Sequence, residues 1–188
     1  MVHRGLRRGL FLLVSIGLAL AVDAVFIEPA RLVINRQELG LPNWPAELSG
    51  LRVALLSDLH VGSPHWNLAR LRELTQKVNA EQPDLILIGG DYQVNGVWFG
   101  THIEAEPIAR ELGQLRAPLG VFSVLGNHDW WNDNRKVRLA LERHGITVLD
   151  DQVRQISFRA GNLCLLGVRD EIVRTRSARQ ELELALPG

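Results

Sequence analysis

The chain has 188 residues with 21 basic and 21 acidic side chains, so its formal net charge is zero. A neutral chain without a long basic run lacks the broad positive surface needed to bind nucleic acid, and we do not expect nucleic acid as a partner. Its 46% apolar composition is enough for the core of one ordinary domain, and its single cysteine, Cys164, excludes an intramolecular disulfide.

The N-terminal region carries an apolar stretch over residues 10–27, preceded by the basic residues Arg4, Arg7 and Arg8. About 20 apolar residues are enough for a helix to cross a bilayer, and a basic flank favours the cytoplasmic side. We therefore expect residues 1–30 to be a single-pass signal anchor in the cell membrane. Residues 31–188 would then form a domain on the extracytoplasmic side.

Two other readings of the N-terminus stay open. The run Ala19-Leu20-Ala21 has the small-x-small form of a signal-peptide cleavage site, in which case the protein would be exported after cleavage. The pair Arg7-Arg8 is also compatible with a twin-arginine export signal.

Apolar runs alternate with segments of helical periodicity through the middle of the chain. We predict an edge strand, core strands separated by helices, and a helix N-cap at Asn67; the expected strands are 31–38, 51–56, 85–88 and 121–125, and the expected helices are 68–78, 106–115 and 132–144. Strands that alternate with helices indicate an α/β domain with a parallel sheet.

The pattern changes after Gly145 to short strands. We predict strands over residues 146–149, 153–158 and 163–168, with turns at Asp150-Asp151 and Gly161-Asn162, and interpret them as the start of a second sheet. Cys164 lies within an apolar run and is expected to be a small core residue. Ser177 and Gln180 predict a capping box for a last helix.

Three polar motifs follow three of the predicted strands directly: Ser57-Asp58-Leu59-His60, Gly89-Gly90-Asp91-Tyr92 and Gly126-Asn127-His128-Asp129. The carboxyl ends of parallel strands meet at one edge of a sheet, where ligands bind. Carboxylates gathered there would repel each other unless cations joined them. Carboxylate, imidazole and amide ligands without a thiolate suit Mn, Fe, Zn or Mg, so we predict two divalent metal ions.

These motifs together, in this order, resemble the first three sequence blocks of the calcineurin-like metallophosphoesterases. Glu28-Pro29 and Trp130-Trp131 are similar to the membrane-anchored bacterial branch of that family. The resemblance implies a metallophosphoesterase-type αββα sandwich. It also implies an enzyme, a hydrolase that cleaves phosphoester bonds as a phosphatase or phosphodiesterase by means of a two-metal-activated hydroxide.

The resemblance further implies a role for each motif residue. Asp58 and His60 would bind the first ion, Asp91 would bridge both ions, and Asn127 would bind the second. His128 would face the phosphate as a catalytic group that aids the leaving oxygen, and Asn127 and His128 would contact the substrate. Asp129 would orient His128, although Asp is also a good N-cap for the helix that follows.

Aromatic residues on the loops after the second and third motifs have two interpretations. Trp98, Phe99, Trp130 and Trp131 either fill the core or line the mouth of the site. Tryptophan near a membrane commonly lies at the headgroup level, so a tryptophan-rich rim would suit a lipid-linked phosphoester. A small phosphorylated molecule is the other substrate class that we expect.

The later blocks of the family pattern are missing from this sequence. No histidine follows His144, so the family's further histidine and its Gly-His-x-His block are absent. We therefore expect an incomplete sandwich, a chain that is a fragment, and little or no turnover by this chain alone. The alternative function is a non-catalytic, membrane-tethered binding module on the same scaffold.

Overall fold

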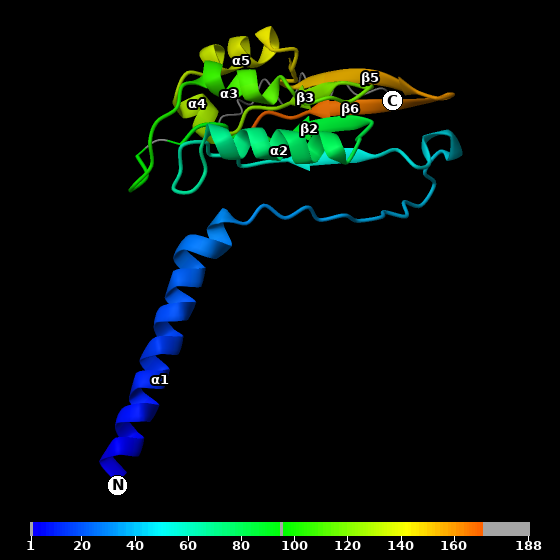
Figure 1. Ribbon diagram of the computed structural model, residues 1–188. Coiled ribbons are helices and arrows are strands. Elements are labelled where there is room, and N and C mark those ends of the chain that lie inside the picture. The colour runs from blue at the N-terminus through cyan, green and yellow to red at the C-terminus, as the bar shows by residue number, and fades with distance from the viewer. Residues whose placement is uncertain (1, 95, 171–188) are drawn as a thin grey trace. The chain divides into compact units, whose positions relative to one another are not determined.

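The computed structural model of the protein describes residues 2–94 and 96–170 (Figure 1). The helix predicted from Ser177 and Gln180 lies outside the described residues. The chain divides into two compact units after Gln37, and each is described by itself.

The N-terminal unit is helical. Helix α1 (Val2–Val22) continues into a π-helical turn (Asp23–Ile27) and a 3-10 turn (Glu28–Ala30). The part from Arg7 to Ala30 is long and apolar enough to cross a membrane, by length and composition. A signal sequence meets the same criteria, so the anchor and the cleaved signal both remain compatible with this helix.

The edge strand predicted over residues 31–38 is wrong. This segment has no regular secondary structure, and the side chain of Val33 is 69% exposed. A strand exists only when its backbone pairs with a neighbour, and none of the described strands pairs with this segment. The alternation of apolar and polar residues there is therefore not accompanied by burial.

The C-terminal unit is built on a sheet of four parallel strands, as the alternation of elements predicted. The strands lie in the order β1 (Val53–Leu56), β2 (Leu85–Ile88), β3 (Val121–Ser123) and β4 (Thr147–Val148). We had assigned residues 146–149 to the second sheet, which is wrong because β4 pairs in parallel with β3. Its connection from β3 runs through helices, and such a crossover returns the chain parallel to the previous strand.

Helices connect the strands and pack in a row in which α2 (Leu68–Ala80) contacts α3 (Ala105–Leu112), and α3 contacts α5 (Asn134–Arg143). The side chain of Asn67 accepts hydrogen bonds from the N–H groups of Ala69 and Arg70, which confirms the predicted cap. The helices bury the apolar positions that their periodicity indicated; these include Leu71, Leu74, Val78, Ile108, Leu112, Val137 and Leu141.

The helix predicted over residues 132–144 is confirmed as α5, and a short helix that was not predicted, α4 (Asn127–Trp131), precedes it. Asn132 separates them with a non-helical backbone, ψ −101°. Asp133 then caps α5 by accepting a hydrogen bond from the N–H of Lys136 at 3.0 Å. The separate α4 matters for the site because it begins within the third motif.

Strands β5 (Gln152–Phe158) and β6 (Gly161–Gly167) form the predicted second sheet as an antiparallel hairpin. Its turn lies at Arg159 and Ala160, two positions before the predicted one. The hairpin packs on the central sheet through a cluster composed of Leu85, Phe122, Leu149, Ile156, Leu163 and Leu165. The unit thus has a helical layer, the parallel sheet and a hairpin layer, in agreement with the α/β class and the metallophosphoesterase fold (Figure 1).

Cys164 is exposed, so its prediction as a core residue is wrong. Side chains alternate between the two faces of a strand, and Leu163 and Leu165 both point to the central sheet. The residue between them must therefore point away from it. The apolar run alone did not show which face would be buried.

Candidate metal centre

The three motifs lie at one edge of the parallel sheet, as the sequence predicted. Asp58 and His60 follow the carboxyl end of β1, Asp91 follows β2, and Asn127 opens α4 shortly after β3. The strands are adjacent and parallel, so their carboxyl ends bring the motifs together.

The first two motifs are loops that lie between two stretches of paired backbone. Pairing of β1 with β2 stops at Leu56 and Ile88 and resumes at a parallel bridge between Val61 and Gln93. Between these two loops, the N–H of His60 donates a hydrogen bond to the carbonyl of Asp91 at 2.8 Å. The two loops are therefore tied to each other by backbone hydrogen bonds at the site itself.

Three motif residues adopt the left-handed backbone conformation, with φ of 53° for Asp58, 39° for His60 and 57° for Asp91. This conformation costs roughly 1–2 kcal/mol for a residue with a Cβ atom. Such residues cluster at functional sites, where the surrounding structure holds them in place.

The glycines beside the motifs allow the backbones to approach closely. A Cβ atom at Gly90, where φ is +93°, would lie 2.2 Å from the backbone nitrogen of Gly126. A Cβ atom at Gly126 would lie 2.2 Å from Oδ1 of Asp91. The second and third motifs are therefore in direct contact only because both positions are glycine.

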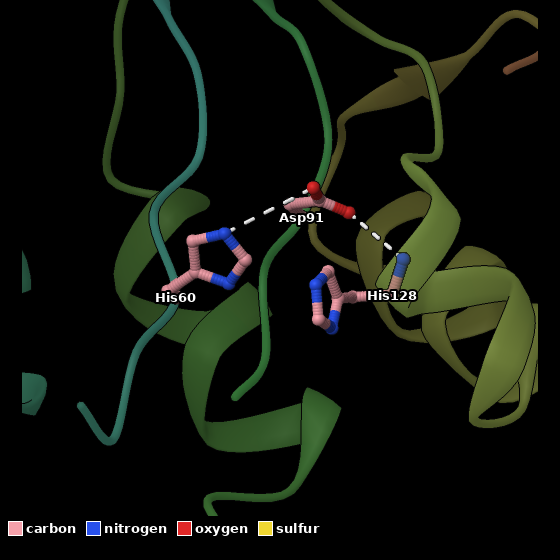
Figure 2. Close-up of side chains that lie close together, drawn as sticks. All are labelled: His60, Asp91 and His128. Carbon is pink, nitrogen blue, oxygen red and sulfur yellow. Dashed lines mark hydrogen bonds and ion pairs between the residues drawn. The ribbon is translucent and has the colours of Figure 1, made fainter. Parts of the chain in front are cut away.

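His60, Asp91 and His128 form the centre of the site (Figure 2). One potential ligand atom from each lies within 4.8 Å of the others. Oδ2 of Asp91 is 3.9 Å from Nε2 of His60, and Oδ1 of Asp91 accepts a hydrogen bond from the backbone N–H of His128 at 3.0 Å. The two imidazole rings meet edge to face, with centroids 4.9 Å apart.

Asp58 lies on the solvent-exposed side of this cluster. Its Oδ1 is 3.9 Å from Nε2 of His60, and its Oδ2 accepts a hydrogen bond from the hydroxyl of Ser57 at 2.5 Å. The Asp58 side chain is 68% exposed, whereas that of Asp91 is 12% exposed. Asn127 is the first residue of α4 and precedes His128 directly.

The donor set fits a divalent metal ion. Nε2 of His60 lies at 3.9 Å from both carboxylates, too far for hydrogen bonds, yet ligands of one ion at about 2.0–2.2 Å are themselves about 3–4 Å apart. Nδ1 of His60 is buried without a hydrogen-bond partner. Within the described residues, the ion pairs of Asp58 and Asp91 are with His60, so neither arginine nor lysine neutralises them. A cation bound at this site would neutralise both carboxylates.

The fully buried Asp129 holds the second and third motifs together. Its carboxylate accepts hydrogen bonds from the N–H groups of Asp91 at 2.7 Å, Tyr92 at 3.0 Å and Gly126 at 3.0 Å. Burial raises the pKa of Asp129 to about 6, and the three hydrogen bonds act in the opposite direction. Both oxygens are used by the backbone, and its orienting role toward His128 stays a prediction.

His128 is fixed from two sides. Its backbone is held by Asp91, and its ring contacts that of Trp131, with centroids 5.0 Å apart. The geometric cluster includes His128 beside His60 and Asp91, whereas we predicted Asn127 as the ligand and His128 as a non-ligand. The division of roles between Asn127 and His128 stays a prediction.

The sequence did not predict that Asp129 links the second and third motifs through hydrogen bonds to backbone N–H groups. The available signal was its place as the third residue of a helix that starts after Gly126, where a carboxylate commonly accepts the N–H of the N-cap residue. The additional bonds to Asp91 and Tyr92 depend on the tertiary approach of two loops, which no local pattern encodes.

Comparisons with known proteins agree with this geometry. The sequence model of the calcineurin-like phosphoesterase family matches residues 51–178. A transmembrane protein with metallophosphoesterase domain from Danio rerio is 30% identical over 159 residues, which are 80% of this chain and 35% of that protein. The UDP-2,3-diacylglucosamine pyrophosphatase LpxG of Chlamydia trachomatis is 34% identical over 110 residues, 58% of this chain and 32% of that protein.

The metallophosphoesterase YkuE of Bacillus subtilis is 25% identical over 151 residues, which cover 80% of this chain and 51% of YkuE. The chain thus spans between about a third and a half of the length of these relatives. The family match covers more than half of the chain and includes all three motifs. The chain therefore belongs to the calcineurin-like phosphoesterase family.

Proposed function

We propose that this chain is the metal-binding part of a membrane-anchored hydrolase that cleaves phosphoester bonds. The observation that carries the proposal is the convergence of His60, Asp91 and His128 within 4.8 Å, beside Asp58, in a member of this family. This arrangement collects negative charge and imidazole nitrogens at a sheet edge, and no lysine or arginine of the described residues forms an ion pair with its carboxylates.

In this proposal Asp58, His60, Asp91 and Asn127 hold two divalent ions, with Asp91 between them. Bound there, the ions would supply positive charge to the phosphoryl oxygens and lower the pKa of water. The partly buried Asp91 is the suitable bridging group, because its loop is fixed by Asp129 and by the backbone of His60.

His128 would act on the leaving group. Its ring belongs to the cluster and is oriented by the contacts with His60 and Trp131. An imidazole there can donate a proton to the leaving oxygen, a contribution of about 10²- to 10⁴-fold for general acid catalysis. Asn127, its neighbour, would contact the substrate together with His128.

The substrate class that we propose is a phosphorylated small molecule or a lipid-linked phosphoester. The Chlamydia relative is named for a pyrophosphatase activity on UDP-2,3-diacylglucosamine, and relatives include transmembrane proteins. We further propose that the basic N-terminal flank stays in the cytoplasm and that the site faces the extracytoplasmic side.

Hydrolysis of an aryl phosphate ester and of an aryl phosphate diester by the full chain in detergent tests this function. Any hydrolysis should require added Mn²⁺ and stop on chelation. It should be lost in Asp91→Ala, and His128→Ala should have a lower turnover with retained metal. His144→Ala is the matched control, because His144 lies at the C-terminal end of α5 and bonds Glu106. If metal binds but neither ester is cleaved, the non-catalytic binding module is the better description.

A further inference from the structure

An exposed aromatic turn follows the second motif. The carbonyl of Val97 accepts a hydrogen bond from the N–H of Gly100 at 3.0 Å, which closes a four-residue turn with Trp98 and Phe99 at its tip. Trp98 is 85% exposed and Phe99 is 91% exposed. Of the two interpretations of the loop aromatics, core filling is therefore wrong for these two residues.

The stem of this turn is fixed to the rest of the unit. The N–H of Thr101 donates to the carbonyl of Gly62 at 2.7 Å, and Nε2 of Gln93 donates to the carbonyl of Ile103 at 2.7 Å. The stem thus rises from the same two loops that carry His60 and Asp91. The tip presents its aromatic side chains from an anchored base.

The turn has an energetic cost that the described chain does not recover. Phe99 adopts φ of +62°, a conformation that costs roughly 1–2 kcal/mol for a residue with a Cβ atom. Leaving a phenylalanine side chain in water instead of burying it forgoes about 1.5–3 kcal/mol. A surface that covers the tip would recover the second amount.

The chemistry of the segment indicates which surface this is. Residues 93–103 contain no Asp, Glu, Lys or Arg, so covering the tip removes no charged side chain from water. Tryptophan and other aromatic side chains favour the headgroup level of a bilayer. The same chain carries a helix long and apolar enough to cross a membrane, so a bilayer is the apolar surface that the chain itself indicates.

The connector between the candidate span and the C-terminal unit is long enough to allow this contact. Residues 31–37 lie between Ala30, where the 3-10 turn ends, and Glu38, where the C-terminal unit begins. At about 3.3–3.6 Å per extended residue, this segment reaches up to about 25 Å. It therefore leaves the C-terminal unit free to turn its aromatic tip to the lipid.

We propose that the Val97–Trp98–Phe99 tip is a membrane-contact loop that places Trp98 and Phe99 in the interfacial layer of the bilayer. Lipid contact would bring the loops of the metal centre to the level of phosphate groups attached to lipids. This contact is a property of the tip itself and does not depend on turnover, so it stands or falls separately from the proposed hydrolase function.

Site-specific fluorescence in vesicles tests the proposal, because the chain has a single and exposed cysteine. In a Trp98→Cys variant that also carries Cys164→Ser, an environment-sensitive fluorophore is attached at position 98. The full chain is reconstituted into phosphatidylcholine vesicles, with or without lipid that carries a nitroxide near the top of its acyl chain. The protein with its native Cys164, labelled in the same way, is the matched control.

We expect blue-shifted emission at position 98 and quenching of more than about half of it by the nitroxide lipid, because aromatic positions of a contact loop lie at the headgroup level. The label on Cys164 should show water-like emission and little quenching. Phe99→Cys in the same background should behave as Trp98→Cys does, which guards against a folding defect in one variant.

Water-like, unquenched emission at both tip positions would overturn the proposal. Blue-shifted emission without quenching by the nitroxide lipid would also overturn it, because the tip would then contact protein, such as a second copy of the chain. Equal far-ultraviolet circular dichroism spectra of the labelled proteins check that the variants fold alike.

Discussion

The carboxylate of Asp129 is bound to the backbone N–H of Asp91, with 2.7 Å between Oδ2 and the nitrogen. Asp129, which follows His128, thus fixes Asp91, the residue that we propose as the bridging metal ligand. The position of Asp91 is set through a buried carboxylate on a different element, rather than by its own loop alone. We therefore expect metal binding and the folding of α4 to be coupled.

We predict that Asp129→Ala strongly destabilises the C-terminal unit. The change leaves three N–H groups without their acceptor, and an unsatisfied buried donor costs about 1–3 kcal/mol, so the free energy of unfolding should fall by about 3 kcal/mol or more. Urea unfolding followed by circular dichroism measures this loss.

The control for that measurement is Asp133→Ala, which removes the exposed cap of α5. Loss of an N-cap costs about 1 kcal/mol, so this variant should be clearly more stable than Asp129→Ala. Equal stability of the two variants would show that the buried carboxylate does not hold the loops together.

Gly90→Ala should weaken metal binding without touching a ligand side chain. An alanine Cβ would lie 2.2 Å from the backbone nitrogen of Gly126 and would require a left-handed alanine, so the second and third motifs must separate. Titration with Mn²⁺ should show at least about tenfold lower affinity, which corresponds to about 1.4 kcal/mol. Gly40→Ala, where a Cβ meets open space, should bind as the unaltered chain does; matching affinities in both variants would contradict the close-approach argument.

The ion pair between Arg72 and Glu111 predicts a pH dependence of stability. Glu111 accepts a hydrogen bond from Nε of Arg72 at 3.0 Å, which joins α2 to α3 and lowers the pKa of Glu111 below its ordinary value of 4.5. A lowered folded-state pKa gives stability that is present above the unfolded-state pKa and is lost as pH falls through the folded-state pKa.

Glu111→Gln should therefore melt at a lower temperature than the unaltered chain at neutral pH, and by less than Asp129→Ala, because the Arg72 side chain is 60% exposed. The difference should shrink as pH falls below 4.5. A difference that stays constant or grows on acidification would contradict this assignment.

Membrane topology gives a further prediction. Arg7 and Arg8 precede the apolar stretch over residues 10–27, so the C-terminal unit should lie on the extracytoplasmic side. Protease added to cells whose outer layer has been opened should digest the C-terminal unit. Complete protection until the cells are lysed would reverse the orientation, and a processed mature N-terminus would favour the cleaved signal.

The sequence predicted the sheet and the site edge well because both depend on local patterns. The apolar run 85–88 matches β2, and each motif follows its strand because short polar residues beside glycine stop a strand. Predictions failed where the outcome depended on whether a segment pairs with a neighbouring strand or on which face of a strand is buried. Residues 31–38 have a strand-like pattern but no partner, and Cys164 lies in an apolar run whose alternation turns it outward.

Within the site, residue types were predictable and contacts were not. Asp91 and His60 could be placed at one edge from the order of the strands, but their backbone bond depends on pairing that resumes beyond both motifs at Val61 and Gln93. Asp129 was assigned to His128 from its neighbourhood in sequence. Its bonds to Asp91 and Tyr92 arise only from the close approach that Gly90 and Gly126 permit.

The most direct test of the account is Mn²⁺ binding by the full chain in detergent, measured by electron paramagnetic resonance for the unaltered protein and for Asp91→Ala. Asp91 lies between His60 and His128, so its removal should abolish or greatly weaken binding, while His144→Ala should bind as the unaltered protein does. Binding by Asp91→Ala with unchanged affinity would show that the metal is held elsewhere, and the proposed centre would be wrong.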